Sequence, residues 1–113
     1  MWISSNDALT NLSGLENLET VGNYLVIRDN YALTSLSGLG NLTSVGGFLG
    51  IYYNTALTSL GLTGLQRVGG YFEIASNPLL CKSLVEELRN QVLLRKGIWG
   101  IIDISGNKEC TTP

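Results

Sequence analysis

Residues Asn30–Tyr53 read NYALTSLSGLGNLTSVGGFLGIYY, and this stretch decides the fold because the chain repeats it on both sides. Residues 6–29 read NDALTNLSGLENLETVGNYLVIRD, and residues 54–76 read NTALTSLGLTGLQRVGGYFEIAS. The three units are 24, 24 and 23 residues long. Near-identical units at this period predict a solenoid, in which each turn of the chain stacks on the turn before it.

Apolar residues recur at fixed positions in every unit, and in the second unit they are Leu33, Leu36, Leu39, Leu42, Val45, Leu49 and Ile51. A steady spacing of three is not that of an amphipathic helix, which alternates threes and fours. The alternation at the end of the unit is typical of a strand. We therefore expect equivalent strands to pair in parallel over one shared core. The pairs Gly46-Gly47 and Gly69-Gly70 predict a tight corner before the strand that uses positive φ.

An asparagine follows each predicted strand at the same offset, and the set is Asn6, Asn30, Asn54, Asn77 and Asn107. Asparagine tolerates turn conformations, and its amide can satisfy backbone groups that a turn leaves free. We expect these side chains to stack and to bond along the solenoid, in a structural role.

The C-terminal part of the chain diverges from the repeat and predicts a cap for the end of the core. A helix is expected over 84–95, with Ser83 and Glu86 as a capping box, Glu87 also in the first turn, Arg95 and Lys96 near its end, and Gly97 as its stop. Its buried face would comprise Leu84, Val85, Leu88, Val92 and Leu93. A last strand is expected over 101–105, with Ile102 and Ile104 pointing inward.

Cys81 and Cys110 bracket this cap. A disulfide between them would close a loop of about 30 residues and would indicate an oxidising compartment. Two buried free thiols and a redox pair are the alternatives. At the other end, residues 1–3 would form a strand with an open edge. Either more of a parent protein precedes this strand or another molecule covers it, and a head-to-head homodimer is one hypothesis.

Composition excludes several classes of protein. With a net charge of −2 and 7 Lys+Arg, the chain lacks the many cations that nucleic acid binding needs. The chain has no His, which excludes His-based catalytic triads and zinc sites, and 2 Cys are too few for an all-thiolate zinc site. No apolar run is long enough to insert into a membrane, and no secretory leader is recognisable at the N-terminus. No cofactor is expected.

The segments NLTSVGGFLGIYYN and GLQRVGGYFEIASNPLLC resemble the receptor L-domain family, and the resemblance covers nearly the whole chain. It implies a short right-handed parallel β-solenoid with a capping helix, and the Asn77–Cys81 segment resembles the point where such a domain meets its terminal disulfide. The family includes ligand-binding domains of growth-factor and insulin-type receptors and many microbial surface proteins. It does not imply one ligand.

The residues between the inward strand positions face outward and form three rows across the predicted sheet. The rows are Tyr24, Phe48, Tyr71 and Ile101; Trp2, Val26, Gly50, Glu73 and Asp103; and Ser4, Arg28, Tyr52, Ala75 and Ser105. An exposed face rich in aromatic residues is typical of a recognition surface, with Gly50 as a shallow dip between rings. The candidate ligand-binding residues are Tyr24, Val26, Arg28, Phe48, Gly50, Tyr52, Tyr71 and Glu73. The same rows would also stabilise a sheet that binds nothing.

Catalysis is not expected. Glu73 and Asp103 are neighbours in the predicted rows, but a shallow sheet face gives two carboxylates no cleft that excludes water. Two carboxylates are also a poor calcium site. The sequons at Asn11 and Asn41 matter only in a eukaryotic secretory pathway.

The sequence thus predicts a mainly β protein, a single solenoid domain over 1–113, with repeats in 1–80 and the cap in 81–113. The predicted function is recognition of a protein or glycan outside the cell or at its surface. The alternative is a structural, self-associating module of a larger surface protein.

Overall fold

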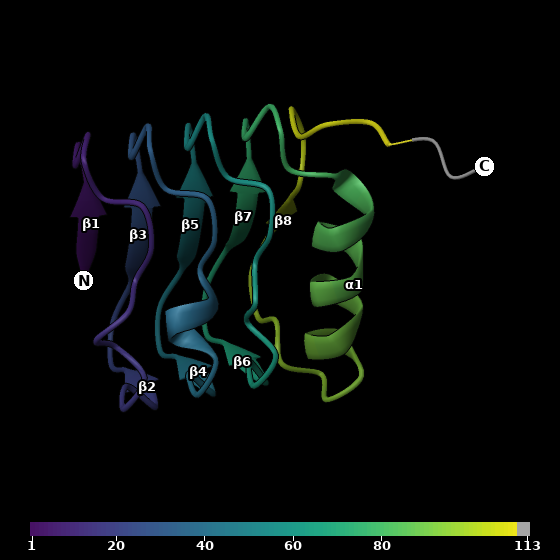
Figure 1. The fold of residues 1–113 in the computed structure, drawn as a ribbon. Helices are drawn as coiled ribbons and strands as arrows, with labels where there is room; N and C mark the ends of the chain where they lie inside the picture. Colours follow the sequence, from purple (N-terminus) through teal and green to yellow (C-terminus); the bar gives the residue numbers. More distant parts are fainter. Residues whose placement is uncertain (111–113) are drawn as a thin grey trace.

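In a computed structural model, which describes residues 1–110, the chain winds into a short parallel β-solenoid (Figure 1). One strand from each turn joins a five-stranded parallel sheet of order β1-β3-β5-β7-β8. Its strands are β1 (Trp2–Ser4), β3 (Leu25–Arg28), β5 (Leu49–Tyr52), β7 (Phe72–Ala75) and β8 (Ile102–Asp103). The predicted mainly β fold with parallel strands is confirmed.

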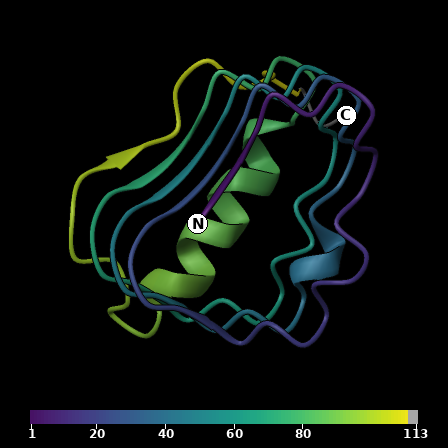
Figure 2. The same ribbon diagram turned by 90° about the vertical axis from the view of Figure 1, so that its left-hand side faces the viewer.

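A second parallel sheet, which the sequence did not predict, runs along another side of the solenoid. Its strands are β2 (Thr20–Val21), β4 (Ser44–Val45) and β6 (Arg67–Val68), in the order β2-β4-β6. The middle turn also contains a short 3-10 helix, Ser37–Leu39. Seen from the N-terminal end, the turns lie in register behind one another, with helix α1 (Lys82–Leu93) across the far end (Figure 2).

The core lies inside the turns of the solenoid and follows the predicted pattern in the middle turns. The inward strand residues Leu25, Ile27, Leu49, Ile51, Phe72 and Ile74 are all fully buried. In the first turn Leu9, Leu15 and Leu18 are only partly buried, because this turn has a neighbour on one side. Ile102 pairs with the inward residue Phe72, as its predicted inward position requires, but it is 37% exposed, because the edge strand β8 pairs with β7 alone. Ile104 is partly buried against the core.

The predicted asparagine ladder is confirmed. Asn54 is fully buried, and its Nδ2 donates to the carbonyl of Ile27 at 3.0 Å and to Oδ1 of Asn77 at 3.3 Å. Its Oδ1 accepts from the backbone N–H and Nδ2 of Asn30, both at 3.2 Å. The amides of Asn30, Asn54 and Asn77 therefore tie their own turns to the turns on both sides.

The residue before each of the first four ladder asparagines has a left-handed backbone: Ser5, Asp29, Tyr53 and Ser76 have φ between 56° and 59°. Such a conformation costs about 1 kcal/mol or more for a residue with a Cβ. It ends the strand and turns the asparagine side chain inward, where its hydrogen bonds offset that cost.

Glycine is required at the Gly-Gly pairs for a different reason from the predicted one. None of the four glycines has a positive φ. Instead, a Cβ on Gly46 would lie 2.4 Å from the carbonyl oxygen of Gly22. The backbones of successive turns approach too closely here for a side chain, so the column requires glycine for contact between turns.

Helix α1 covers the C-terminal end of the core, as expected, but its ends differ from the prediction. The predicted capping box is wrong, because Cys81 is the N-cap and no side chain caps the helix. Ser83 and Glu86 lie inside the helix, and its first turn has no acidic residue, Glu87 included. The buried residues are Val85, Leu88 and Val92; Leu84 is partly buried and Leu93 is 40% exposed.

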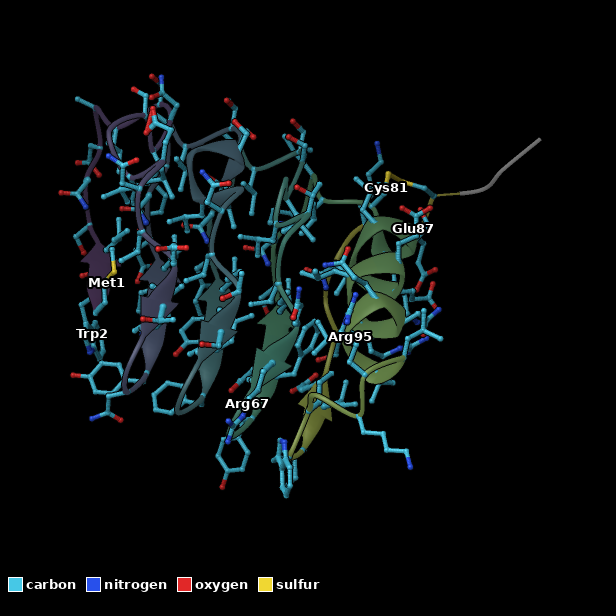
Figure 3. The ribbon with its side chains drawn as sticks, turned by 90° about the horizontal axis from the view of Figure 1, so that it is seen from below. Met1, Trp2, Arg67, Cys81, Glu87 and Arg95 are labelled. Atoms are coloured by element: carbon cyan, nitrogen blue, oxygen red, sulfur yellow. A yellow bond between two sulfur atoms is a disulfide. The ribbon has the colours of Figure 1, made fainter. Side chains whose placement is uncertain are left out.

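The segment after α1 returns along the solenoid. Lys96, not Gly97, takes the left-handed conformation, with φ 52°. Gly97 is needed for space, because a Cβ there would lie 2.0 Å from the carbonyl oxygen of Gln66. The disulfide between Cys81 and Cys110 is present beside the start of α1 (Figure 3), so the free thiols and the redox pair are set aside.

The first strand, β1, has a partner only in β3, and Trp2 is 55% exposed beside that open edge. Residues 111–113 lie outside the described residues, and the predicted single domain over 1–113, with repeats in 1–80 and the cap in 81–113, stays a prediction.

The ladder makes one substitution costly. We expect Asn54→Ala to lower the free energy of unfolding by about 3 kcal/mol or more, because it leaves buried donors and acceptors on three turns without partners. Asn6→Ala is the matched control: Asn6 is exposed at the end of the ladder, and its loss is expected to cost less than about 1 kcal/mol. Urea denaturation followed by circular dichroism measures both, and equal losses would contradict the argument.

The glycine column gives a second matched pair. A Cβ on Gly69 would lie 2.1 Å from the carbonyl oxygen of Gly46, whereas one on Gly22 meets nothing within 4 Å. We expect Gly69→Ala to destabilise by about 2 kcal/mol or more and Gly22→Ala to stay within about 0.5 kcal/mol of the wild type. Thermal unfolding of both variants tests this, and a neutral Gly69→Ala would show that the turns can separate freely.

Candidate functional site

The outer face of the five-stranded sheet carries the residues that the sequence singled out. The strand register places Val26 beside Gly50, Gly50 beside Glu73, and Glu73 beside Asp103. It also places Arg28 beside Tyr52. The predicted rows are therefore confirmed as neighbours wherever the register covers them, and the question is which of their side chains a ligand could reach.

Two of the predicted ligand-binding residues are out of reach. Val26 is fully buried although it lies outside the core cluster, and Gly50 is buried as well. The predicted dip at Gly50 is wrong, because the Tyr52 ring lies over it: a Cβ on Gly50 would be 2.7 Å from Cε1 of that ring. The Tyr52 ring thus fills the space that Gly50 leaves on the face.

An aromatic row runs along the edge where the strands begin. The rings of Tyr24 and Phe48 stack at 5.2 Å with 10° between their planes, and Trp2 meets Tyr24 edge to face at 6.1 Å. Tyr71 continues the row on the next turn and is 53% exposed. Stacked rings stabilise the sheet, while Trp2 and Tyr71 leave aromatic surface free for contact.

Arg28, at the opposite edge of the face, is held by its own neighbours. Its Nε donates to Asp29 at 2.7 Å, and its guanidinium carbon lies 5.3 Å from the Tyr52 ring centre and 5.8 Å from that of Tyr53. The hydrogen bond to Asp29 is the main reason that the pKa of Arg28 is raised. Arg28 therefore supports the rim of the face and is not a free cation.

Tyr52 belongs to the same rim. Burial raises the pKa of its phenol, and the nearby Glu73 carboxylate raises it further. The hydroxyl group is therefore neutral at physiological pH and is able to donate a hydrogen bond.

The hollow of the face lies over β7 and β8, displaced from the predicted dip by more than one strand. It has a volume of about 270 Å³ and is lined by Tyr71, Glu73, Ile101 and Asp103. Sequence reasoning placed Ile101 and Asp103 in the outward rows but missed them as site residues. The sequence feature that could have identified these two residues is the end of the repeat. The last strand has a neighbour on one side only, so its outward side chains stay exposed, and Ile101 is 69% exposed.

The hollow combines an apolar wall with two carboxylates. Asp103 accepts from the backbone N–H of Ser105 at 3.0 Å and from its hydroxyl at 2.7 Å. These two hydrogen bonds lower the pKa of Asp103. A permanent negative charge beside an exposed tyrosine suits a ligand that offers hydroxyl, amide or ammonium donors.

A family model described as Receptor L domain matches residues 1–93, most of the chain. The chain belongs to the receptor L-domain family. Neither the search of curated proteins nor the search of solved structures found a significant match. Receptor L domains are non-catalytic ligand-binding domains, which agrees with the sheet face as a place for recognition.

Within residues 1–110 of this receptor L domain, no group of three or more His, Cys, Asp and Glu side chains converges to hold a metal ion. In the same residues no helix is long and apolar enough to cross a membrane.

The hydrogen bonds of Asp103 predict a measurable change. Ser105→Ala removes the hydroxyl donor and leaves the backbone donor, so the pKa of Asp103 should rise toward its ordinary value, about 3.9. The lowered pKa in the folded protein contributes stability above the ordinary pKa, and that stability is lost as the pH falls through the folded value. Carbon-detected NMR titration of the carboxyl group gives the pKa directly. Ser59→Ala is the control, and an unchanged pKa in Ser105→Ala would contradict the assignment.

Proposed function

We propose that this receptor L domain binds a protein or glycan ligand through the outer face of its five-stranded sheet, outside the cell or at its surface. The observation that carries the proposal is the hollow of about 270 Å³ at Tyr71, Glu73, Ile101 and Asp103, which lies where the exposed aromatic row ends. Membership of a ligand-binding family supports recognition over a purely structural role. The Cys81–Cys110 disulfide supports an oxidising, extracellular setting.

The candidate ligand-binding residues fall into groups according to their exposure and their neighbours. Tyr24, Phe48 and Tyr71 offer ring surface, and Glu73 and Asp103 offer carboxylate acceptors. Arg28 and Tyr52 form the rim that holds the face in shape. Val26 and Gly50 act only through packing, because neither is exposed.

Tyr71 and Tyr31 make a matched pair for a test, because both are tyrosines that are 53% exposed and only Tyr71 lies on the face. The wild type is screened against an array of neutral and acidic glycans and a panel of purified surface ectodomains. For a probe that binds, Tyr71→Ala is expected to weaken binding about tenfold or more, since an aromatic contact at the centre of a site dominates affinity. Tyr31→Ala should bind as the wild type does.

Binding that survives both Tyr71→Ala and Asp103→Asn would overturn the sheet face as the site. No binding to any probe of either set would favour the structural alternative.

The second candidate is self-association through the N-terminal end. It is favoured by the open edge of β1 and by the exposure of Trp2, which stands at that end in Figure 3. A second copy could pair edge to edge with β1 and cover the partly buried leucines of the first turn. Light scattering over a wide concentration range distinguishes the cases: a dimer that Trp2→Ser dissociates supports the homodimer, and a monomer at all concentrations rejects it.

A further inference from the structure

A second hollow, apart from the sheet face, gathers positive charge. It has a volume of about 400 Å³ and is lined by Gln66, Arg67, Arg95, Lys96, Gly97 and Trp99. The chain has 7 Lys+Arg and a net charge of −2, so three of its few cations line one hollow. In Figure 3, Arg67 and Arg95 lie toward the α1 end of the molecule, away from Trp2.

These three cations make no ion pair within residues 1–110. The ion pairs there join Arg28 to Asp29, Lys82 to Glu109 and Arg89 to Glu86. The lining of the hollow includes no Asp or Glu. Uncompensated like charges repel one another, and an anion placed among them relieves that repulsion.

Arg67 is not a repeat of what stands before it. The register of the second sheet places it beside Ser44, and Ser44 beside Thr20. The first two turns thus carry small hydroxyl residues where the third carries a guanidinium group. At this position, a positive charge appears only in the third turn, which lies next to α1 and the loop that follows it.

The backbone fixes the other side of the hollow. The Val68 N–H donates to the Gly97 carbonyl at 2.6 Å, and the Trp99 N–H donates to the Val68 carbonyl at 3.2 Å. Gln91 Nε2 anchors α1 by donating to the carbonyls of Leu62 and Leu65, at 3.1 and 2.8 Å. The cations are therefore mounted on a segment that is bonded to the solenoid.

Trp99 supplies the remaining feature. It is 71% exposed, and the guanidinium carbon of Arg67 lies 6.0 Å from its ring centre. An indole can pack against the apolar face of a sugar ring, while a guanidinium group bonds a carboxylate or sulfate in bidentate fashion. An exposed ring beside unpaired cations is the combination that an acidic sugar needs.

We propose that this hollow binds an acidic glycan, with the sugar ring against Trp99 and its carboxylate or sulfate group held by Arg67, Arg95 and Lys96. The site does not depend on the sheet face, whose hollow carries the carboxylates of Glu73 and Asp103 and would repel the same group. A run of Asp and Glu residues offers carboxylates but no ring-shaped apolar surface for Trp99. Three cations are also too few to hold the phosphate backbone of nucleic acid at physiological salt.

Lys96 allows a test in which a loss of binding cannot be attributed to unfolding of the protein. Its backbone has φ 52°, a conformation that glycine adopts without strain. Lys96→Gly should therefore leave thermal stability unchanged or raise it, while removing one of the three charges.

The experiment titrates oligogalacturonate and a heparin oligosaccharide into a Trp2→Phe background, in which Trp99 is the one tryptophan and reports by fluorescence. Uncharged dextran and poly-glutamate of matched charge are the comparison probes. We expect at least one acidic glycan to bind, with affinity that falls as salt rises, and dextran not to bind. Arg67→Gln, Arg95→Gln and Lys96→Gly should each weaken binding about two- to fivefold.

Lys108→Gln is the matched control, because it removes one cation near the start of α1, about 18 Å along the helix from Lys96. It should leave binding unchanged. Isothermal calorimetry of Trp99→Ala should show at least a tenfold loss for the glycan. Carboxylate and sulfate recognition are separated by which of the two glycans binds more tightly.

Three results would overturn the proposal. The first is poly-glutamate binding as tightly as the glycan and with an affinity that Trp99→Ala does not change, which would indicate an acidic-peptide or purely electrostatic surface. The second is a loss of binding in Lys108→Gln as large as that in Lys96→Gly. The third is the absence of binding by both acidic glycans. Tyr71→Ala tests whether the two sites are independent, because a variant that loses binding at the sheet face should still bind the acidic glycan at this hollow.

Discussion

The buried amide ladder is the interaction on which the rest of the structure depends. Each ladder asparagine in the middle turns bonds to the turn before it and to the turn after it, so the side chains do at the corner what backbone pairing does in the strands. The left-handed residue before each asparagine ends the strand at the same point in every turn. Strand ends fixed in this way fix the register, and the register decides which side chains share the outer face. A recognition surface made of rows exists because the corner repeats without slipping.

Close stacking of successive turns is the second constraint, and it requires that certain positions carry no side chain. At the column of Gly46 and Gly69 the backbones of successive turns approach so closely that no Cβ fits. For a different reason, a small residue on the sheet face does not make a hollow. Gly50 and Tyr52 lie two residues apart on the same strand, β5, and the Tyr52 ring covers Gly50, so the space of the missing side chain is filled. The hollow that includes Asp103 and the hollow that includes Trp99 are both lined in part by the segment after α1, where the chain has left the repeat.

Sequence alone predicted what the repeat controls. Leu49 and Ile51 had to be buried together because their counterparts recur in every unit, and the same argument gave the rows and the ladder, whereas the capping helix was predicted from its own apolar face. It failed where side-chain conformation decides: Val26 was expected on the surface and is buried, and the hollow lies at Asp103 and not at Gly50. Ser83 and Glu86 had the spacing of a capping box, but the chain enters α1 at Cys81, next to the disulfide. Spacing could not show which residue the tertiary structure would choose as the N-cap.

The regular turns and the irregular segment after α1 contribute different residues to the two hollows. In the first two turns, the positions equivalent to Arg67 and Glu73 hold Thr20, Ser44, Val26 and Gly50, all uncharged. At these two positions charge enters in the third turn, and Trp99 and Asp103, which lie beside Arg67 and Glu73, come from the segment that leaves the repeat after α1. The two hollows carry opposite charge, and salt screens such fields over about 8 Å, so each can attract its own class of group. The regular turns supply a rigid platform whose edges are set by the ladder. The irregular segment after the third turn completes both hollows, because each is lined by side chains of the third turn together with side chains that follow α1.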